Sequence, residues 1–230
     1  MDLTSQFFEF EQWFKSPSGQ RLELELSECL QNIPQIHSGS SLLQIANCGH
    51  NPWLSWMSYQ NQWILSPSAS LQTDVIASPL AIPLAKESLD CIFAPFLFDL
   101  IPNDPLLMVY ELDRILESMG HIIILGLNPT GLWKLSRFFS SHHHWYQQKN
   151  TCSYWKIKSL FKNLGYEQMH AHFFYFIPPV ESKHWMNYFA IVNRISRFIA
   201  FYPPAFYLLT LQKRQFSWVR PVLAKPNPCI

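Results

Sequence analysis

Glycine is scarce in this sequence, which has 7 glycines against 17 prolines among its 230 residues. It contains neither a phosphate-binding P-loop nor a G-x-S-x-G nucleophile elbow, and the spacing of its residues indicates no nucleophile–base pair. These absences argue against the P-loop nucleoside triphosphatases and the α/β-hydrolases. Because 16% of the residues are aromatic, the composition instead indicates a bulky interior with loops that are punctuated by proline.

Paired cysteines, long apolar runs and an export signal are also missing. The five cysteines are scattered without a CxxC pair, which indicates reduced thiols in a cytoplasmic protein. The longest apolar stretch, at about 198–211, is interrupted by Pro203-Pro204 and is too short to cross a bilayer. No basic segment precedes an apolar run after Met1, so we expect no signal peptide. We therefore expect a cytoplasmic location and no transmembrane segment, and nothing in the sequence indicates an oligomeric state.

Acidic residues almost disappear in the second half of the chain. Residues 1–133 contain 4 basic and 14 acidic residues, whereas residues 134–230 contain 13 basic and 2 acidic ones. The favoured interpretation is that the two halves pack together and neutralise each other. The alternative is a basic surface for an anionic partner such as RNA or a lipid headgroup layer.

Hydrophobic periodicity predicts alternating helices and strands in one domain. Two amphipathic helices, 3–14 and 21–30, are separated by a break at 16–19. A helix from Pro105 to about Ser118, with Asp104 as its N-cap, is expected to end at Gly120 and to bury Leu107, Tyr110, Leu112, Ile115 and Leu116. The other expected helices begin at 52 and 154, and the expected strands are 42–45, 63–65, 74–77, 89–94, 121–125, 166–177 and 205–212.

The stretch from Leu42 to His50 is the centre of the predicted organisation. A short apolar strand is followed at once by the turn Ala46-Asn47-Cys48-Gly49, and a helix can begin at Asn51-Pro52. Strand, tight turn and helix is the arrangement by which a doubly wound sheet brings backbone N–H groups to a nucleotide-like ligand. With one glycine in the turn, the motif is weak when it is taken alone.

Three segments further along the chain give this turn a context. Residues 82–93 and 104–120 resemble two motifs of the class I S-adenosylmethionine-dependent methyltransferases, and more narrowly of the methyltransferase type 11 family. Residues 126–133, Gly-Leu-Asn-Pro-Thr-Gly-Leu-Trp, resemble a small uncharacterised bacterial branch of that family. The resemblance runs in order from about Phe7 to Arg214. It implies an α/β fold with a Rossmann-like, doubly wound, seven-stranded sheet, mostly parallel with an antiparallel terminal strand, and helices on both faces.

The resemblance also implies a division of the chain. Residues 1–40 would form a helical cover, residues 41–215 the methyltransferase-like domain with a helical insertion at about 181–201, and residues 216–230 a tail. The cofactor, S-adenosylmethionine, would lie across the carboxyl ends of the first strands. It is expected to contact the turn after the first strand, Ser66 near the ribose, and an adenine pocket after the third and fourth strands. Together these contacts comprise Gln44, Ala46, Asn47, Cys48, Gly49, Ser66, Ser78, Pro79, Pro95 and Phe96.

The sequence departs from the family pattern at two cofactor contacts. The three usual turn glycines correspond to Ala46, Cys48 and His50, and a methyl group at Ala46 is tolerated only where φ is negative. The acidic residue that usually accepts bonds from the ribose hydroxyls is missing, because the segment after the second strand is Leu65-Ser66-Pro67-Ser68. Ser66 is a weaker, uncharged acceptor. Pro95 and Phe96 also have a simpler interpretation, as a strand end and a core side chain.

The substrate side is expected to contain Trp13, Asn128, Trp133, His143 and Tyr146. Asn128-Pro129 follows the fifth strand rather than the fourth, so it is not the asparagine motif of the enzymes that methylate nucleic acid bases. The aromatic and basic segment around 185–202 indicates a lipid-like acceptor, contact with a membrane surface, or a lid. The leading hypothesis is a methyltransferase that acts on a small or lipid-like acceptor. The alternatives are an inactive methyltransferase-fold binding or scaffold module and, less favoured, an RNA-binding protein.

Histidine clusters do not predict a metal site. Three consecutive histidines, His142 to His144, rarely bind one ion, and no cysteine or carboxylate lies within a few positions of them. His170 and His172 would share one face of a strand, where core or rim positions are more common than ligand positions. We therefore expect no metal.

Overall fold

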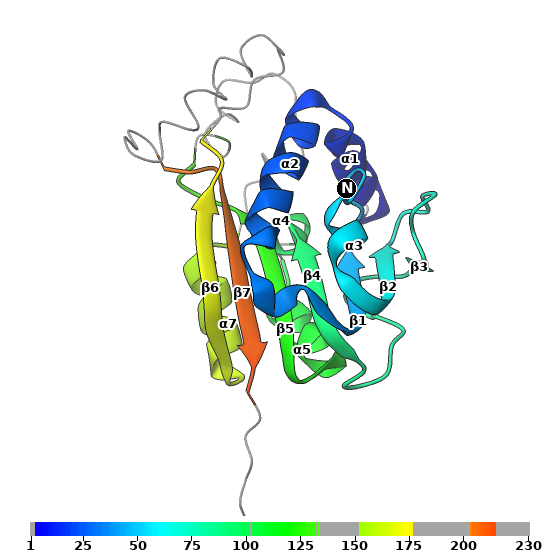
Figure 1. Cartoon of the computed structure of the whole chain (residues 1–230), viewed down its shortest axis with the longest axis vertical. Coiled ribbons are helices and arrows are strands. Elements are labelled where there is room, and N and C mark those ends of the chain that lie inside the picture. The colour runs from blue at the N-terminus through cyan, green and yellow to red at the C-terminus, as the bar shows by residue number, and fades with distance from the viewer. Residues whose placement is uncertain (1–2, 102, 132, 134–151, 177–202, 215–230) are drawn as a thin grey trace, which may run out of the picture.

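The computed structural model describes residues 3–101, 103–131, 133, 152–176 and 203–214. Its centre is a seven-stranded sheet with the order β3-β2-β1-β4-β5-β7-β6 (Figure 1). The strands are β1 (Ser38–Ile45), β2 (Ser58–Ser66), β3 (Val75–Ile76), β4 (Leu89–Pro95), β5 (Leu116–Leu127), β6 (Tyr166–Phe174) and β7 (Phe206–Lys213). The first five pair in parallel, and β7 runs antiparallel to both of its neighbours. This confirms the predicted fold class.

The order in which the chain adds strands to the sheet reverses at β1, which lies between β2 and β4. From β1 the chain continues to β2 on one side, where Leu43 is opposite Trp63, and later reaches β4 on the other side, where Leu43 is opposite Ile92. Such a switch point opens a crevice at the carboxyl ends of the strands, where ligands bind in sheets of this kind. The fold therefore places the loop after β1 at the position that favours a ligand.

Helices cover both faces of this sheet. The helices α2 (Pro17–Gln31) and α3 (Trp53–Trp56) lie on one face, and α5 (Pro105–Ile115) and α7 (Tyr154–Asn163) lie on the other, while α1 (Leu3–Phe14) lies at the carboxyl ends of β1 and β2 (Figure 1). Two short elements complete the described part, the 3-10 turn η1 (Pro34–Ile36) and the helix α4 (Leu97–Leu100). No helix in the described ranges is long and apolar enough to cross a membrane.

The break expected at 16–19 is instead the start of α2. Ser16 is its N-cap and accepts a hydrogen bond from the Gly19 N–H at 3.2 Å, and Pro17 occupies the first turn, where its missing N–H costs nothing. A Cβ at Gly19 would lie 2.4 Å from the Phe14 Cα, so glycine allows the end of α1 to approach α2 closely. The two helices are thus joined by a very short linker. The strand β1 begins at Ser38, within the segment 1–40 expected to form the helical cover. The division of the chain at residue 40 stays a prediction.

The helix α5 ends earlier than its sequence predicts. It stops at Ile115, and β5 begins at Leu116, so that Gly120 lies inside a strand and does not end the helix. The pairing of Leu116 with Leu89 on β4 draws these residues into the sheet. Leu107 and Tyr110, expected in the core, are 59% and 52% exposed, because the buried face of the helix consists of Met108, Val109, Leu112 and Ile115. The Asp104 side chain makes no capping hydrogen bond.

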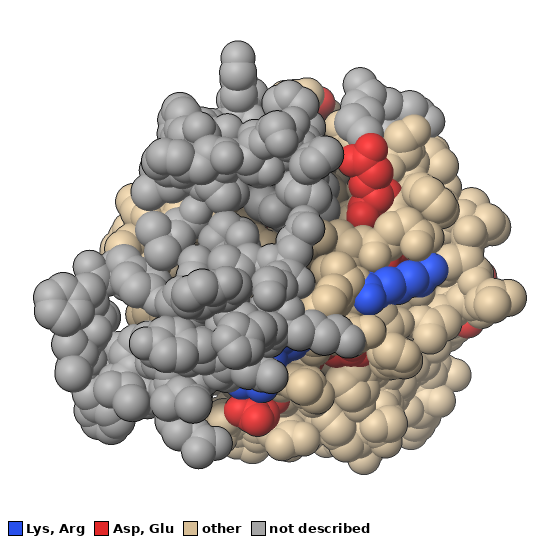
Figure 2. Space-filling view, turned by 90° about the horizontal axis from the view of Figure 1, so that it is seen from above, with Lys and Arg blue, Asp and Glu red and all other residues tan. Residues whose placement is uncertain are grey.

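One ion pair joins the acidic and basic halves of the chain within the described residues of β7 and α5. Lys213 Nζ lies 3.1 Å from Asp113 Oδ1. On the described part of the face in Figure 2, lysine, arginine, aspartate and glutamate side chains are few, and they form no extended patch of one sign. Much of the basic half, including the aromatic segment around 185–202, lies outside the described residues. Both interpretations of the charge asymmetry therefore stay predictions.

Two carboxyl groups share a hydrogen bond at the amino ends of β4 and β5. Burial acts against ionisation of Asp90, but hydrogen bonds from Glu117 and from the backbone of Ser41 and Ser40 lower its pKa. The same bond to Asp90 raises the pKa of Glu117 to about 7. The pair therefore holds one proton at a pH where an ordinary glutamate, with a pKa of about 4.3, has lost it.

This pair predicts a pH-dependent stability. The folded pKa of Glu117 lies above its unfolded value, so this residue's contribution is present below about pH 4.5 and is lost as the pH rises to about 7. Replacing Glu117 by glutamine removes this loss. After allowance for solvent screening, we expect the variant to be about 1 kcal/mol more stable than the parent at pH 8. Urea denaturation at pH 5 and pH 8 measures the effect, with Glu28→Gln, a change at an exposed glutamate of α2, as the control.

Candidate functional site

The loop after β1 has an unusual backbone. Ala46 and Gly49 have φ angles of +77° and +76°, and Asn51 has a φ of +50°. A residue with a Cβ in this region is less stable by about 1–2 kcal/mol, so the methyl group of Ala46 is in the unfavourable conformation. The N–H of Ala46 donates to the Leu65 carbonyl of β2 at 2.8 Å, which holds the first turn residue against the sheet.

A network of side chains fixes this loop from within. Asn51 Oδ1 accepts hydrogen bonds from Gln44 Nε2 at 2.6 Å and from the Cys48 N–H at 3.0 Å, and Asn51 Nδ2 donates to Asn47 Oδ1 at 2.8 Å. The fully buried Gln44 also accepts a bond from Trp53 Nε1 at 2.7 Å. Gln44 therefore holds the loop in place, and its amide is engaged by protein groups.

Two glutamates from the N-terminal helices bind the same loop. Glu11 of α1 accepts hydrogen bonds from the Ser66 hydroxyl at 2.8 Å and from the Asn47 N–H, and Glu23 of α2 accepts one from the His50 N–H at 2.6 Å. Their exposed fractions are 6% and 4%. Burial raises the pKa of Glu11, although the bond from Ser66 acts against this shift. The backbone N–H groups of Asn47 and His50, which could otherwise bind an anion, are thus engaged by the protein's own carboxylates.

Glu11 and Glu23 are absent from the residues predicted for the site. A signal for Glu11 exists in the sequence, because it lies four residues after Phe7 and three before Phe14, on the apolar stripe of its helix. A carboxylate on a buried stripe needs a polar partner. The partner, Ser66, is 55 residues further along the chain, so that sequence spacing alone does not identify it.

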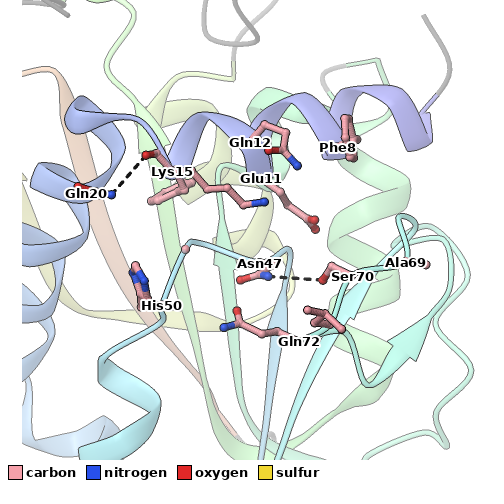
Figure 3. Close-up of a pocket in the computed structure, with 13 residues that line it drawn as sticks. Phe8, Glu11, Gln12, Lys15, Gln20, Asn47, His50, Ala69, Ser70 and Gln72 are labelled. Carbon is pink, nitrogen blue, oxygen red and sulfur yellow. Dashed lines mark hydrogen bonds between the residues drawn. The ribbon is translucent and has the colours of Figure 1, made fainter.

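A cavity of about 560 Å³ lies between α1, the loop after β1 and residues 69–72. Figure 3 shows Glu11 of α1, and Lys15 directly after this helix, extending toward Asn47, Ser70 and Gln72. Asn47 Nδ2 lies 3.5 Å from Ser70 Oγ across its floor. The lining combines polar and apolar side chains and consists of Phe8, Glu11, Gln12, Phe14, Lys15, Gln20, Asn47, Gly49, His50, Ala69, Ser70, Leu71 and Gln72.

Two of the predicted cofactor residues, Asn47 and Gly49, line this cavity. Ser66 is fully buried behind it, where it donates to Glu11 and accepts from the Ser68 N–H at 3.1 Å. Ala46 and Cys48 are also fully buried, and burial raises the pKa of the Cys48 thiol. Three further predicted residues lie outside the lining. They are Gln44 in the network above, Ser78, which accepts from the Leu80 N–H at 3.3 Å, and the buried Pro79.

Aromatic rings fill the carboxyl ends of β4 and β5. Phe96, which follows Pro95 at the end of β4, is fully buried with a φ of +54°. Its ring centroid lies 5.7 Å from that of Phe10 and 5.4 Å from that of Phe206. The apolar wall expected at Pro95 and Phe96 is therefore packed against α1 and β7. Edge-to-face contacts of this kind stabilise a core beyond the area that they bury.

The predicted substrate residues are partly brought together. Trp13 and Trp133 contact each other edge-to-face with ring centroids 5.5 Å apart, and Trp133 is 1% exposed. Asn128 donates to the Pro204 carbonyl at 2.8 Å and accepts from the Thr130 N–H at 3.2 Å, so its side chain closes a turn. His143 and Tyr146 lie outside the described residues.

No group of three metal-ligating side chains occurs in the described ranges. His170 and His172 share a face of β6, where their rings are stacked with centroids 6.3 Å apart. The histidines at 142–144 lie outside the described residues.

Comparisons with known proteins complete the description of the site. No family model matches the sequence, and no curated protein matches it. Among solved structures, an S-adenosylmethionine-dependent methyltransferase from Archaeoglobus fulgidus is similar with a TM-score of 0.62 and 16% identity, over 90% of this chain and 99% of that one. The fold is that of the class I methyltransferases.

Two further matches show how broad this fold is. Geranyl diphosphate C-methyltransferase from Streptomyces coelicolor A3(2), in complex with Mg²⁺, geranyl diphosphate and S-adenosylhomocysteine, has a TM-score of 0.56 and 12% identity, over 84% of this chain and 80% of that one. The [4+2]-cyclase SpnF has a TM-score of 0.52 and 12% identity, over 83% and 80% of the two chains. At these identities the likeness shows the fold alone.

Proposed function

We propose that the chain is an S-adenosylmethionine-dependent methyltransferase that acts on a small or lipid-like acceptor. The observation that carries this proposal is the cavity of about 560 Å³ at the carboxyl ends of β1 and β2, next to the loop with Asn47 and Gly49. Its volume lies within the range of about 300–1,000 Å³ typical of small-molecule sites. The switch point at β1 puts the cavity where doubly wound sheets bind nucleotide-like ligands.

Methyl transfer from a sulfonium needs little catalytic machinery. A nucleophile held in line with the methyl group, in a pocket that excludes water, supplies most of the rate. The aromatic pair Trp13 and Trp133 adjoins the cluster around Phe96 and offers an apolar boundary on the acceptor side. One similar structure holds a prenyl diphosphate, which supports a lipid-like acceptor as a candidate class.

A second candidate is a methyltransferase-fold protein that binds a nucleoside-like ligand without catalysis. Two observations favour it. The N–H groups of Asn47, Cys48 and His50 are already engaged by side-chain oxygens, and Phe96 is buried under Phe10 at the end of β4. In this case the protein's own side chains occupy the donors of the turn and the end of β4, and the fold serves binding rather than methyl transfer.

Calorimetric titration of the full chain with S-adenosylmethionine and S-adenosylhomocysteine tests the proposal. We expect binding of both, and no heat at millimolar ligand would reject it. The two candidates are then separated by incubating the chain with methyl-labelled S-adenosylmethionine and extracts of small metabolites or lipids. Label in an extracted product supports the enzyme, whereas binding without label transfer to any extract supports the non-catalytic protein.

A further inference from the structure

We infer that Glu11, carried by α1, is the carboxylate that accepts hydrogen bonds from the vicinal hydroxyls of a ribose bound in the cavity. This inference rests on the proposed function, because it takes the nucleoside part of S-adenosylmethionine as the ligand. It assigns that role to a residue of the N-terminal helix, outside the segment that follows β2.

The position of the carboxylate is the first argument. Sheets of this class bind the ribose beside an acidic residue at the end of the second strand, and here β2 ends at Ser66 without a carboxylate. Glu11 Oε1 lies 2.8 Å from the Ser66 hydroxyl and the carboxylate also accepts the Asn47 N–H. The carboxylate of α1 therefore stands between the ends of β1 and β2.

The hydrogen-bonding capacity of Glu11 is the second argument. An ionised carboxylate has about four acceptor positions and no donor. The protein fills two of them, from Ser66 and Asn47, and the side chain also lines the cavity. A pair of hydroxyl donors suits such a partly filled acceptor, since hydrogen bonds to a charged acceptor are roughly twice as strong as neutral ones.

The rest of the lining agrees with a neutral, hydroxylated ligand part beside Glu11. Gln12, Gln20 and Gln72 offer amide groups that both donate and accept. Lys15 lines the same cavity, and its positive charge partly offsets the burial that raises the pKa of Glu11. An anionic ligand group next to Glu11 would meet like charge. The lining therefore favours the sugar and base of a nucleoside at this end of the cavity.

A purely structural role for Glu11 makes different predictions. If its only work were to join the loop after β1 to the end of β2, replacing it would weaken all ligands alike. If it receives ribose hydroxyls, its replacement weakens a ligand only when that ligand has the hydroxyls. The test therefore compares adenosine, 2′-deoxyadenosine and 3′-deoxyadenosine on the parent chain and on two variants.

The variants are Glu11→Gln and the matched control Glu9→Gln, which changes an exposed glutamate on the same helix. We expect E11Q to weaken S-adenosylhomocysteine by about 10- to 100-fold, the equivalent of one hydrogen bond to a charged group, and E9Q to leave it unchanged. We expect the parent to prefer adenosine to at least one deoxynucleoside by about 10-fold or more. In E11Q the ratio of the Kd values for the deoxynucleoside and adenosine should fall close to one.

Each outcome has a distinct meaning. A preference that persists in E11Q, or equal binding of all three nucleosides by the parent, overturns the inference while leaving the methyltransferase proposal intact. The parent comparison needs no variant, so equal binding of the three nucleosides overturns the inference even if E11Q does not fold. A preference for adenosine that E11Q removes, without binding of either S-adenosyl compound, supports the role of Glu11 and rejects the proposed function. Absence of binding by every ligand rejects both.

Discussion

Replacing Phe10 by alanine is expected to lower the free energy of unfolding by about 3–5 kcal/mol, the usual cost of deleting a buried phenylalanine ring. Phe10 is fully buried, and its ring contacts those of Phe14 and Phe96 with centroids 5.1 Å and 5.7 Å away. Its removal leaves a void at the end of β4 that its aromatic neighbours fill only in part. For a chain of this size the melting temperature should fall by about 6–20 °C.

The control for this prediction lies on the same helix. Phe8 is 51% exposed, so Phe8→Ala should cost less than about 1 kcal/mol. Thermal melting and urea denaturation of both variants measure the difference. Similar stabilities for the two variants would mean that α1 is not packed on the sheet through Phe10, and the arrangement of the whole cavity would then be wrong.

Replacing Gly49 by valine is expected to abolish detectable binding of S-adenosylmethionine, with an increase in Kd of at least about 100-fold. Gly49 has a φ of +76°, and a Cβ there would lie 3.0 Å from Glu23 Oε2. The β-branched side chain adds backbone strain of about 1–2 kcal/mol and pushes against a carboxylate that holds the His50 N–H. The loop must shift, and Gly49 also lines the cavity.

Gly165→Val separates binding from stability. Gly165 follows the C-terminal end of α7 with a φ of +85° and does not line the cavity. Its substitution brings a comparable backbone strain, so it should lower the melting temperature and leave the Kd unchanged. Unaltered affinity in G49V, measured by calorimetry on folded protein, would contradict the placement of the ligand beside this loop.

The sheet was predictable because most of its strands contain a short apolar run, in the order that a doubly wound fold requires. The ends of elements were less predictable. Gly120 has the local character of a helix end, yet Leu116 pairs with Leu89 and carries the chain into β5 four residues earlier. Pairing energy from a distant strand outweighs a local turn preference, as is common at element boundaries. Likewise, Pro17 and Gly19 begin α2, where their local character indicated a break.

The candidate site was predictable in its place and less so in its composition. The position of the turn after β1 follows from the order of the elements. The conformation of Ala46 does not, since a φ of +77° is imposed by the network of Gln44 and Asn51 rather than by local preference. The approach of Glu11 to Ser66 joins α1 to β2 through the tertiary fold. No spacing rule reports such a contact.

The adjacency of Phe10 and Glu11 on α1 has a consequence for how this site tolerates change in chain length. Neighbouring residues on a helix point about 100° apart, and here one enters the aromatic cluster while the next reaches Ser66. Inserting a single residue in α1 after Glu11 would rotate both side chains relative to the part of the helix anchored by Phe14. The ring would then lose its packing and the carboxylate its partner together, so insertions here are far more damaging than substitutions at exposed positions of the same helix.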